Sequence, residues 1–193
     1  MGKVIFGLTM SLDGYINDRN ASVERLYSDL ALGNVQDESI QNNEVMQEAI
    51  RSTGAVVMGK NAFLMAEDPD SYADSYEFQV PIFVLTGTKP EKNPKENENL
   101  TFTFVTEGIQ AAISQAKQVA GGKDVTIIGG ANTAQQALRA GLVDELQIDI
   151  MPVLLCGGLR LFEALEAEQI RLERMQVVEL PAGRTHLRFR IVQ

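Results

Sequence analysis

The feature that most constrains this chain is a short apolar run followed by a glycine pair and a helix start, residues 125–138 (VTIIGGANTAQQAL). Residues 125–128 are β-branched and largely apolar, which is typical of a buried strand. Gly129 and Gly130 then interrupt the run. Asn132 or Thr133 can cap a helix, because apolar residues recur behind them at helical spacing, at Ala134, Ala137 and Leu138.

This order of strand, glycine pair and helix start allows two interpretations. Glycines lack a Cβ, so a ligand can approach the backbone closely, and the free N–H groups and positive dipole end of the helix suit a phosphate. Alternatively, the pair forms a tight turn that needs glycine for backbone reasons alone. The stretch is not the dinucleotide fingerprint G-x-G-x-x-G, because Ala131 stands where the second spaced glycine belongs.

Length and charge narrow the class of protein. A chain of 193 residues fits one domain, residues 1–193, with a sizeable core. The formal net charge of −9 argues against nucleic acid as a partner, because binding phosphates needs clustered positive charge. No apolar run approaches the length of a membrane span, and the N-terminus lacks the pattern of a signal peptide. We therefore expect a cytoplasmic protein with no membrane partner.

Cys156 and His186 are the only cysteine and the only histidine. A single cysteine excludes an intramolecular disulfide and a cysteine-based zinc site. A Ser-His-Asp or Cys-His catalytic pair, and most zinc sites, would depend on His186, which lies in a strand-like run near the C-terminus. We expect no metal, a packing role for Cys156 near a glycine turn, and a structural or surface role for His186.

Strand-like runs alternate with helical patterns along the chain. Buried strands are expected within residues 3–9, 55–58, 81–86 and 101–105, and a further strand within 141–150. Helices are expected at 44–51 and 108–120, the second with an apolar face of Ile109, Ala112, Ile113, Ala116 and Val119. Residues 170–180 and 185–192 flank a Pro-Gly turn and predict an antiparallel hairpin. The whole pattern predicts an α/β sandwich on a mainly parallel sheet, with antiparallel strands at one edge.

Two stretches have weaker signals. Residues 21–43 are polar and only partly periodic, although four positions fit one helical face: Val23, Leu26, Tyr27 and Leu30. Leu161 and Phe162 begin a short apolar stretch that resembles a helix.

Three strand ends carry a glycine: Gly59-Lys60, Thr86-Gly87 and Gly129-Gly130. Parallel strands place these junctions on one edge of the sheet, where open α/β sheets bind ligands. Lys60 opposes the dipole of the helix that it opens, which makes sense if an anion binds nearby; the alternative is a solvated lysine. A dinucleotide, with its pyrophosphate and adenosine phosphate, fits several such junctions side by side.

In series, these motifs resemble the dihydrofolate reductase-like superfamily, and most closely the reductase domain of the bifunctional riboflavin-biosynthesis deaminase/reductase and its stand-alone relatives. The resemblance implies a three-layer α/β/α sandwich, an NADPH-dependent reductase and a homodimer. The residues that carry it span nearly the whole chain in the family's order: 11–16 (SLDGYI), 58–60 (MGK), 127–130 (IIGG), 141–146 (GLVDEL), 152–158 (PVLLCGG) and 161–162 (LF).

The resemblance also implies positions for the cofactor. Its phosphates would bind at Gly59, Lys60 and Asn61, its adenosine end along Thr86 and Gly87, and its pyrophosphate at Gly129, Gly130, Ala131 and Thr133. Lys60 stands where an arginine is usual, and a lysine keeps the charge without the bidentate fork, so a preference for NADPH over NADH is less secure. Asp13 and Gly14 would belong to the loop over the nicotinamide and substrate.

The implied reaction is hydride transfer to a C=N or C=O carbon of a pyrimidine or pterin-like heterocycle, with Asp13 as the acid that protonates the other atom. The nearest activity is that of 5-amino-6-(5-phosphoribosylamino)uracil reductase in riboflavin biosynthesis. The deaminase half is absent, because the chain has no H-x-E and P-C-x-x-C pair.

Two alternatives remain open: a dihydrofolate reductase proper, and a nucleotide-binding module without catalysis. Dihydrofolate reductases carry a pterin-binding acid in the region that corresponds to residues 21–43. The acids available around that region are Asp29, Asp37, Glu38 and Glu44, and the sequence singles out none of them.

Overall fold

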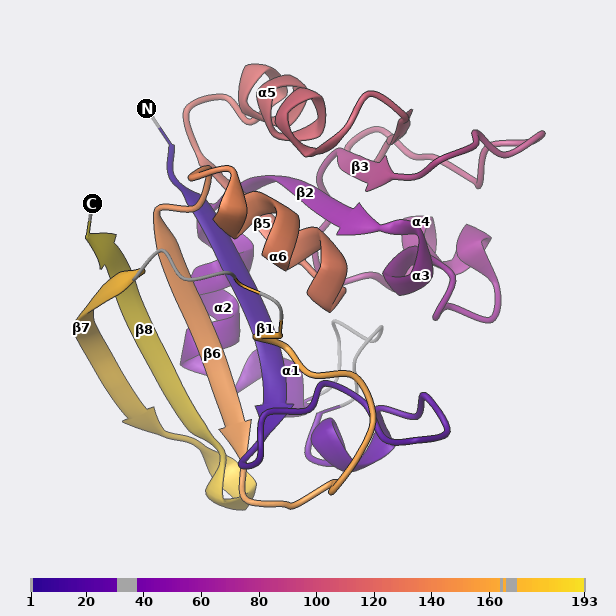
Figure 1. Cartoon of the computed structure of the whole chain (residues 1–193). Helices are drawn as coiled ribbons and strands as arrows, with labels where there is room; N and C mark the ends of the chain where they lie inside the picture. Colours follow the sequence, from indigo (N-terminus) through magenta and orange to yellow (C-terminus); the bar gives the residue numbers. More distant parts are fainter. Residues whose placement is uncertain (1, 31–37, 164, 166–169, 193) are drawn as a thin grey trace.

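The computed structural model describes residues 2–30, 38–163, 165 and 170–192. Its eight strands form one sheet in the order β4-β3-β2-β5-β1-β6-β8-β7 (Figure 1). The strands are β1 (Val4–Ser11), β2 (Thr53–Gly59), β3 (Ile82–Leu85), β4 (Phe102–Val105), β5 (Asp124–Ile128), β6 (Glu145–Met151), β7 (Arg171–Glu179) and β8 (Thr185–Val192). Each predicted strand is present within a few residues of its expected bounds.

The sheet is mainly parallel, with an antiparallel end. Strands β1 to β6 pair only in parallel with one another, while β8 pairs antiparallel with both β6 and β7. This confirms the predicted C-terminal hairpin. Because the parallel strands run the same way, the loops that follow β1, β2, β3, β5 and β6 emerge at one edge of the sheet.

Helices cover both faces and make three layers. The helical segments are η1 (Glu24–Leu26), α1 (Glu38–Gln41), α2 (Glu44–Ser52), α3 (Lys60–Phe63), η2 (Pro69–Ser71), α4 (Tyr72–Ser75), α5 (Ile109–Val119), α6 (Ala131–Arg139) and η3 (Pro181–Gly183). One core joins α5 and α6 to the strands, and a second joins side chains of α2, α3 and α4 to β2, β3 and β4. In Figure 1, α6 lies in front of the sheet and α2 behind it. Among the described residues, no helix combines the length and apolarity that crossing a membrane requires.

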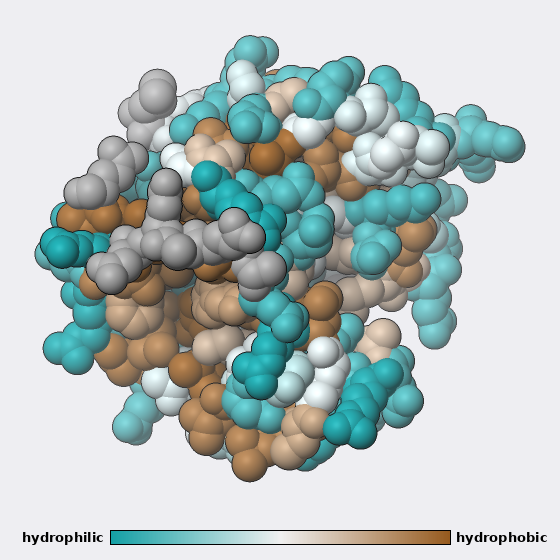
Figure 2. Space-filling view, in the orientation of Figure 1, coloured by the Kyte–Doolittle hydropathy of each residue, from teal (hydrophilic) through white to brown (hydrophobic). Residues whose placement is uncertain are grey.

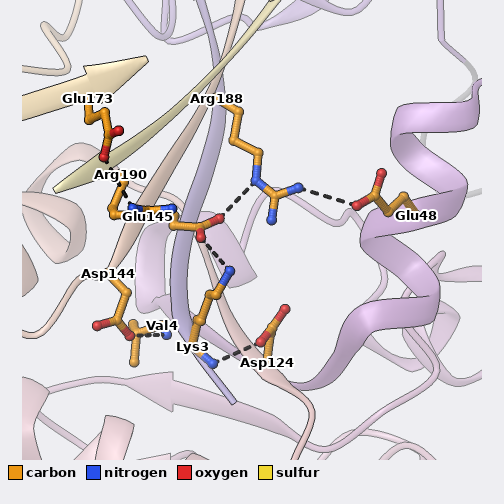
Figure 3. A network of polar contacts seen from close by, with 9 residues as sticks. All are labelled: Lys3, Val4, Glu48, Asp124, Asp144, Glu145, Glu173, Arg188 and Arg190. Carbon is orange, nitrogen blue, oxygen red and sulfur yellow. Dashed lines mark hydrogen bonds and ion pairs between the residues drawn. The ribbon is translucent and has the colours of Figure 1, made fainter. Parts of the chain in front are cut away.

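A charged network lies on the sheet face that carries α2 (Figure 3). Glu145 of β6 accepts hydrogen bonds from Lys3 Nζ and from Arg188 Nε, the latter at 2.8 Å, and Arg188 Nη1 also donates to Glu48 of α2. The Glu145 side chain is buried. Burial raises its pKa, but the hydrogen bonds from Lys3 and Arg188 outweigh burial and hold the pKa of Glu145 below its usual value. The network ties the N-terminus, α2 and the hairpin together.

Two helix predictions are wrong in detail. Residues 23–30 contain only the three-residue η1 instead of a longer helix, because this segment is held by its contacts with β1 and Arg184. Leu161 is buried, but no helix begins there; its carbonyl accepts a hydrogen bond from the Gln135 side chain, which holds an irregular loop against α6.

Two burial predictions also fail. Val119, the last residue of α5, is 51% exposed, whereas Ile109, Ala112, Ile113 and Ala116 of the same face are buried. Cys156 is exposed, and its positive φ of 55° places it in a turn instead of in a packed layer.

Candidate functional site

The carboxyl ends of β3, β2 and β5 lie side by side, because these strands are neighbours in the sheet. The Gly59 N–H at the end of β2 donates to the Gly129 carbonyl beyond β5, at 3.1 Å. Leu85, at the end of β3, pairs with Gly59, so Thr86 and Gly87 follow on the other side. The structure thus brings together the three strand–glycine junctions that the sequence indicated.

The glycine pair leaves open space before α6. The helix begins at Ala131 with Gly130 as its N-cap and without a side-chain cap, so the predicted capping by Asn132 or Thr133 is wrong. Gly129 has a φ of +62°, which turns the chain directly from strand to helix and leaves no room for a capping residue. A Cβ built at Gly130 would meet no atom within 4 Å.

Backbone N–H groups face this open space. The first hydrogen bond of α6 runs from the Ala134 N–H to the Gly130 carbonyl, at 3.2 Å. The N–H groups of the preceding helical residues therefore have no acceptor within the helix. A nine-residue helix presents them with the positive end of its dipole. Donors, dipole and the missing Cβ together fit an anionic group such as a pyrophosphate.

Gly59 is required by packing against α6. A Cβ at Gly59 would lie 2.5 Å from the Thr133 hydroxyl oxygen, and Thr133 itself is buried. Ala131 is buried as well. The side chains of Thr133 and Ala131 therefore belong to the contact between β2 and α6. Only the backbone N–H groups of these two residues are then available to bind a ligand.

The other predicted cofactor residues differ in exposure. Lys60 and Asn61 are exposed at the start of the four-residue α3, directly after Gly59. Thr86 is buried, and its hydroxyl donates to the Thr88 carbonyl at 2.9 Å, which shapes the turn after β3. Gly87 faces open space, because a Cβ there would meet no atom within 4 Å.

Asp13 holds the loop that follows β6. Its carboxylate accepts a hydrogen bond from the Ser11 hydroxyl at 2.6 Å and from the backbone N–H groups of Leu155 at 3.1 Å and Cys156 at 2.8 Å. The bond from Ser11, supported by those of Cys156 and Leu155, lowers the pKa of Asp13 from its usual value. Gly14 follows in the same turn with a φ of 85°. This geometry favours an ionised Asp13 carboxylate, which positions residues 153–156. It opposes a role for Asp13 as a proton donor.

Arg184, which sequence reasoning missed, is a fully buried cation near the same edge. Its Nε donates to Asp29 Oδ2 at 2.9 Å, and its Nη2 donates to the other carboxylate oxygen and to the Leu26 carbonyl. Its Nη1 donates to Thr9 of β1 at 2.8 Å and to Asp149 of β6 at 3.4 Å. Burial lowers the pKa of Arg184, but the hydrogen bond with Asp29 and the charges of Asp149 and Asp29 together outweigh burial and raise that pKa, so the guanidinium stays charged.

Asp149 links Arg184 to the histidine. Its second oxygen lies 2.7 Å from Nδ1 of His186, which is buried, so the predicted structural role of His186 is confirmed. Nearby, burial raises the pKa of Tyr27, whose side chain hydrogen-bonds to Thr9. The carboxylates of Asp29 and Asp149 are both engaged by cationic or ring N–H groups of the hairpin.

The four acids around residues 21–43 are now distinguished. Asp29 points inward to Arg184, whereas Glu38 and Glu44 are exposed on α1 and α2. Asp37 lies outside the described residues. No sequence signal identified Arg184, because it follows a Pro-Ala-Gly turn where an exposed residue is the ordinary expectation. Across the described ranges, no three His, Cys, Asp or Glu side chains gather as ligands for a metal ion.

Comparison with known proteins decides the family. The sequence model of the RibD C-terminal domain matches residues 2–185. The chain belongs to the RibD C-terminal domain family. The chain is also similar to the Bacillus subtilis protein YyaP, with 24% identity over 169 residues, which covers 83% of this chain and 80% of YyaP.

Solved structures support the same fold. A putative riboflavin biosynthesis protein from Shewanella sp. PV-4 superposes with a TM-score of 0.75 at 24% identity, covering 99% of each chain. Dihydrofolate reductase from Enterococcus faecalis, complexed with NADP(H), superposes with a TM-score of 0.60 at 14% identity, covering 100% of this chain and 98% of that one. The protein therefore has the dihydrofolate reductase-like fold that the sequence predicted.

Proposed function

We propose that this protein is an NADPH-dependent reductase that acts on a pyrimidine or pterin-like heterocycle, with 5-amino-6-(5-phosphoribosylamino)uracil as the first substrate to test. The observation that carries the proposal is the alignment of three glycine junctions at the ends of β3, β2 and β5. Membership of the RibD C-terminal domain family gives the same expectation. An oxidoreductase that uses a dinucleotide needs such a row of phosphate sites.

Different residues of the chain would bind different parts of the cofactor. We assign the pyrophosphate to the backbone at Gly129, Gly130 and the first turn of α6, where a Cβ at Gly130 would intrude into open space. Lys60 and Asn61 would meet a phosphate on the adenosine side, and Gly87 leaves room beside them. When bound, the nicotinamide supplies a hydride to an electrophilic carbon.

Asp13 as proton donor stays a prediction, and its surroundings favour another role. Its carboxylate already binds Ser11 and the backbone of Leu155 and Cys156, and its pKa is lowered. We therefore propose that Asp13 positions the loop beside the substrate and that water delivers the proton. The alternative function, a nucleotide-binding module without catalysis, predicts the same cofactor site without turnover.

The first test measures the melting temperature with NADPH, with NADH and with neither. A ligand at a hundredfold excess over its dissociation constant stabilises the protein by about 2.7 kcal/mol. That corresponds to a rise of roughly 5–10 °C for a domain of this size. We expect the larger rise with NADPH, and loss of the rise in Gly130→Leu, whose side chain would fill the space before α6.

Gly122→Leu is the matched control, because a Cβ at Gly122 also faces open space, but in the turn before β5 at the opposite edge of the sheet. Its positive φ lowers the basal melting temperature, and its rise with NADPH should nevertheless equal that of the wild type. If neither cofactor raises the melting temperature of the wild type, the reductase proposal fails.

Turnover then separates the remaining candidates. Loss of NADPH absorbance with the phosphoribosylamino-uracil supports the riboflavin-type reductase. Turnover with dihydrofolate and inhibition by antifolates would support a dihydrofolate reductase proper. Cofactor binding without oxidation across pyrimidines and pterins would support the non-catalytic module.

A further inference from the structure

The sheet face beneath α2 is polar at its antiparallel end. Side chains of a strand alternate between the two faces of the sheet. Leu146 and Ile148 of β6 belong to the main core, so Gln147 between them points to the face that carries α2. Arg188 of β8 lies opposite Gln147, and Gln176 of β7 lies opposite Arg188, so all three share this face. We call these three residues the polar row.

The other face of the same strands has the opposite character. Figure 2 shows brown, apolar residues gathered over the region where β6, β8 and β7 lie in Figure 1. On the polar side, α2 contributes no fully buried residue, although it lies over the sheet. Polar groups between a helix and a sheet need hydrogen-bond partners, from the protein or from a ligand.

A cavity of about 90 Å³ lies between the polar row and α2. Ala49 and Ser52 of α2 line one side, and the polar row lines the other. Asp124, the first residue of β5, also lines the cavity, whereas the glycine junction follows the last residue of β5. The cavity is therefore separate from the glycine junctions at the carboxyl edge. We call it the helix–sheet cavity.

His186 presents a polar atom to this cavity. The residue lines the cavity and is only 3% exposed. Its Nδ1 lies 2.7 Å from Asp149 Oδ1, and since a carboxylate only accepts hydrogen bonds, Nδ1 is the donor. Nε2 is the remaining ring nitrogen, and no hydrogen bond from another described residue reaches it. A buried polar atom of this kind favours a bound partner, because leaving it unsatisfied costs free energy.

Arg188 presents a second such group (Figure 3). Its Nε donates to Glu145 at 2.8 Å, and its Nη1 donates to Glu48 at 3.2 Å. Within the described residues, its third nitrogen, Nη2, donates to no acceptor. The bond with the buried Glu145 fixes the guanidinium in place. The cavity wall therefore holds one oriented cation with an N–H group available to a ligand.

These groups favour a small oxyanion. A guanidinium, two side-chain amides and the Ser52 hydroxyl supply donors of the kind that bind phosphate oxygens. Nε2 of His186 accepts a hydrogen bond when the ring is neutral and donates one when the ring is protonated. A partly protonated phosphate carries both O–H donors and oxygen acceptors, so it can pair with Nε2 in either state.

The size of the cavity agrees with such a ligand. A cavity of about 150 Å³ binds benzene, so the 90 Å³ here suits a ligand of about four or five heavy atoms. Inorganic phosphate is within this size. A nucleobase or a larger ring is not.

Two carboxylates around the cavity limit the affinity for an anion. Glu48 already binds Arg188 as a bound anion would, so it competes with the ligand for the guanidinium. Its side chain is 60% exposed and can turn into solvent when an anion binds. Asp124 accepts a hydrogen bond from the Lys3 backbone N–H at 2.8 Å, and the Lys3 ammonium binds Glu145. Removing the charge of Glu48 should therefore strengthen anion binding.

We propose that the helix–sheet cavity binds a phosphate-class oxyanion, held by Arg188 Nη2, His186 Nε2 and the amides of the polar row. The ligand is free inorganic phosphate or the phosphoryl end of a small phosphomonoester. The cavity lies on the α2 face of the sheet, so the proposal does not rest on the reductase activity.

The test follows the imidazole of His186, the only histidine of the chain, by nuclear magnetic resonance. Inorganic phosphate is titrated into protein that carries isotopically labelled histidine, at fixed pH and ionic strength, with sodium chloride as the control. We expect a saturable shift of the Nε2 resonance with phosphate and none with chloride. Phosphate bound to exposed lysines elsewhere would leave this resonance unchanged.

Three variants assign the contacts. Arg188→Met should weaken phosphate binding by on the order of tenfold or more, because it removes a charge-assisted hydrogen bond. Arg190→Met makes the same change further along β8, at an exposed ion pair outside the cavity, and should leave the dissociation constant unchanged. Glu48→Gln should tighten binding severalfold, because the competing charge is gone. Damage to the fold could not produce that gain.

A fourth variant guards against loss of the fold, because Arg188→Met also removes a partner of the buried Glu145. Gln147→Leu keeps the ion pair of Arg188 with Glu145 and should still weaken phosphate binding. Four results would overturn the proposal: a His186 resonance that ignores phosphate, equal losses in Arg188→Met and Arg190→Met, weaker binding in Glu48→Gln, or unchanged binding in Gln147→Leu.

A second ligand distinguishes the source of the oxyanion. Glycerol 3-phosphate carries the same phosphoryl group on a short polar chain. Tighter binding than that of inorganic phosphate would identify a phosphomonoester as the ligand, and weaker binding would identify the free ion.

Discussion

Replacing Arg184 by methionine should destabilise the protein more than removing the charge of any other residue on the C-terminal hairpin. Arg184 is fully buried, and its partner Asp29 is only 8% exposed. Methionine approximates the length of the arginine stem but donates no hydrogen bond. Arg184→Met therefore leaves the carboxylate of Asp29, the Leu26 carbonyl and the Thr9 hydroxyl without their common donor.

The magnitude follows from what remains buried. Removing one partner of a buried ion pair costs about 3–5 kcal/mol, because the other charge is left without compensation. For a domain of this size, each kcal/mol lowers the melting temperature by roughly 2–4 °C. We therefore expect a fall of about 10 °C in the melting temperature, and a lower urea midpoint with an unchanged m-value.

The same substitution at Arg190, within the adjoining strand β8, gives the control. Arg190 pairs with Glu173, but the two side chains are 55% and 58% exposed, so solvent screens the pair. Exposed pairs contribute about 0–1 kcal/mol, and Arg190→Met should change the melting temperature by no more than a few degrees.

A double variant separates the lost charge pair from lost packing. Replacing both partners of a buried pair by apolar residues can be neutral or stabilising, so Arg184→Met with Asp29→Leu should recover much of the loss. If Arg184→Met and Arg190→Met unfold at the same temperature, the contacts of Arg184 with residues 24–29 contribute nothing to the free energy of unfolding. That outcome would refute the prediction.

Three further outcomes follow from the structure. The pKa of Glu145 is lower in the folded than in the unfolded state. Its contribution to stability is therefore complete above the unfolded pKa of about 4.3 and is lost as the pH falls through the folded-state pKa. Glu145→Gln should accordingly flatten the acid side of a plot of melting temperature against pH. An equally steep acid limb in the variant would contradict this. Gly59→Ala should destabilise the protein through its clash with the Thr133 hydroxyl, and Thr133→Ala should relieve part of that loss, whereas Gly87→Ala, which faces open space, should be nearly neutral by thermal melting. Asp13→Asn should lower the melting temperature non-additively with Ser11→Ala, because one hydrogen bond is lost in both; strictly additive effects would show that the two side chains act separately.

The sheet could be predicted because its strands carry their own signals. Residues 125–128 are β-branched and end at glycines, and the C-terminal runs flank a Pro-Gly turn, so local pattern and tertiary placement agree. The row of glycine junctions followed from one further rule, that parallel strands end at the same edge. Residues 23–30 could not be predicted in the same way. Their position depends on Arg184, more than 150 residues later, and no local periodicity encodes such a contact.

The edge with the three glycine junctions shows which part of a site a motif can specify. Gly129 and Gly130 act through their backbones, so their identity and spacing already contain the relevant property, the absence of a Cβ before a helix. The family resemblance implied that Thr133 binds the pyrophosphate, yet its hydroxyl faces Gly59, because α6 packs closely on β2. The motif predicts where a ligand can approach, whereas packing decides which side chains remain available to it.

The acids illustrate the same limit for catalysis. A carboxylate in a turn after the first strand is a reasonable proton donor from sequence, and Asp13 occupies that position. What the sequence does not encode locally is the set of donors that reaches Asp13 from residues 155 and 156, more than 140 positions away. These donors, with Ser11, stabilise the ionised form and lower the pKa of Asp13, which opposes proton donation near neutral pH. Asp29 and Asp149 are likewise engaged by Arg184 and His186. The acids near the carboxyl edge therefore serve first to fix the loop and the hairpin, and under the proposed function the chemistry would come from the cofactor, the heterocycle and water.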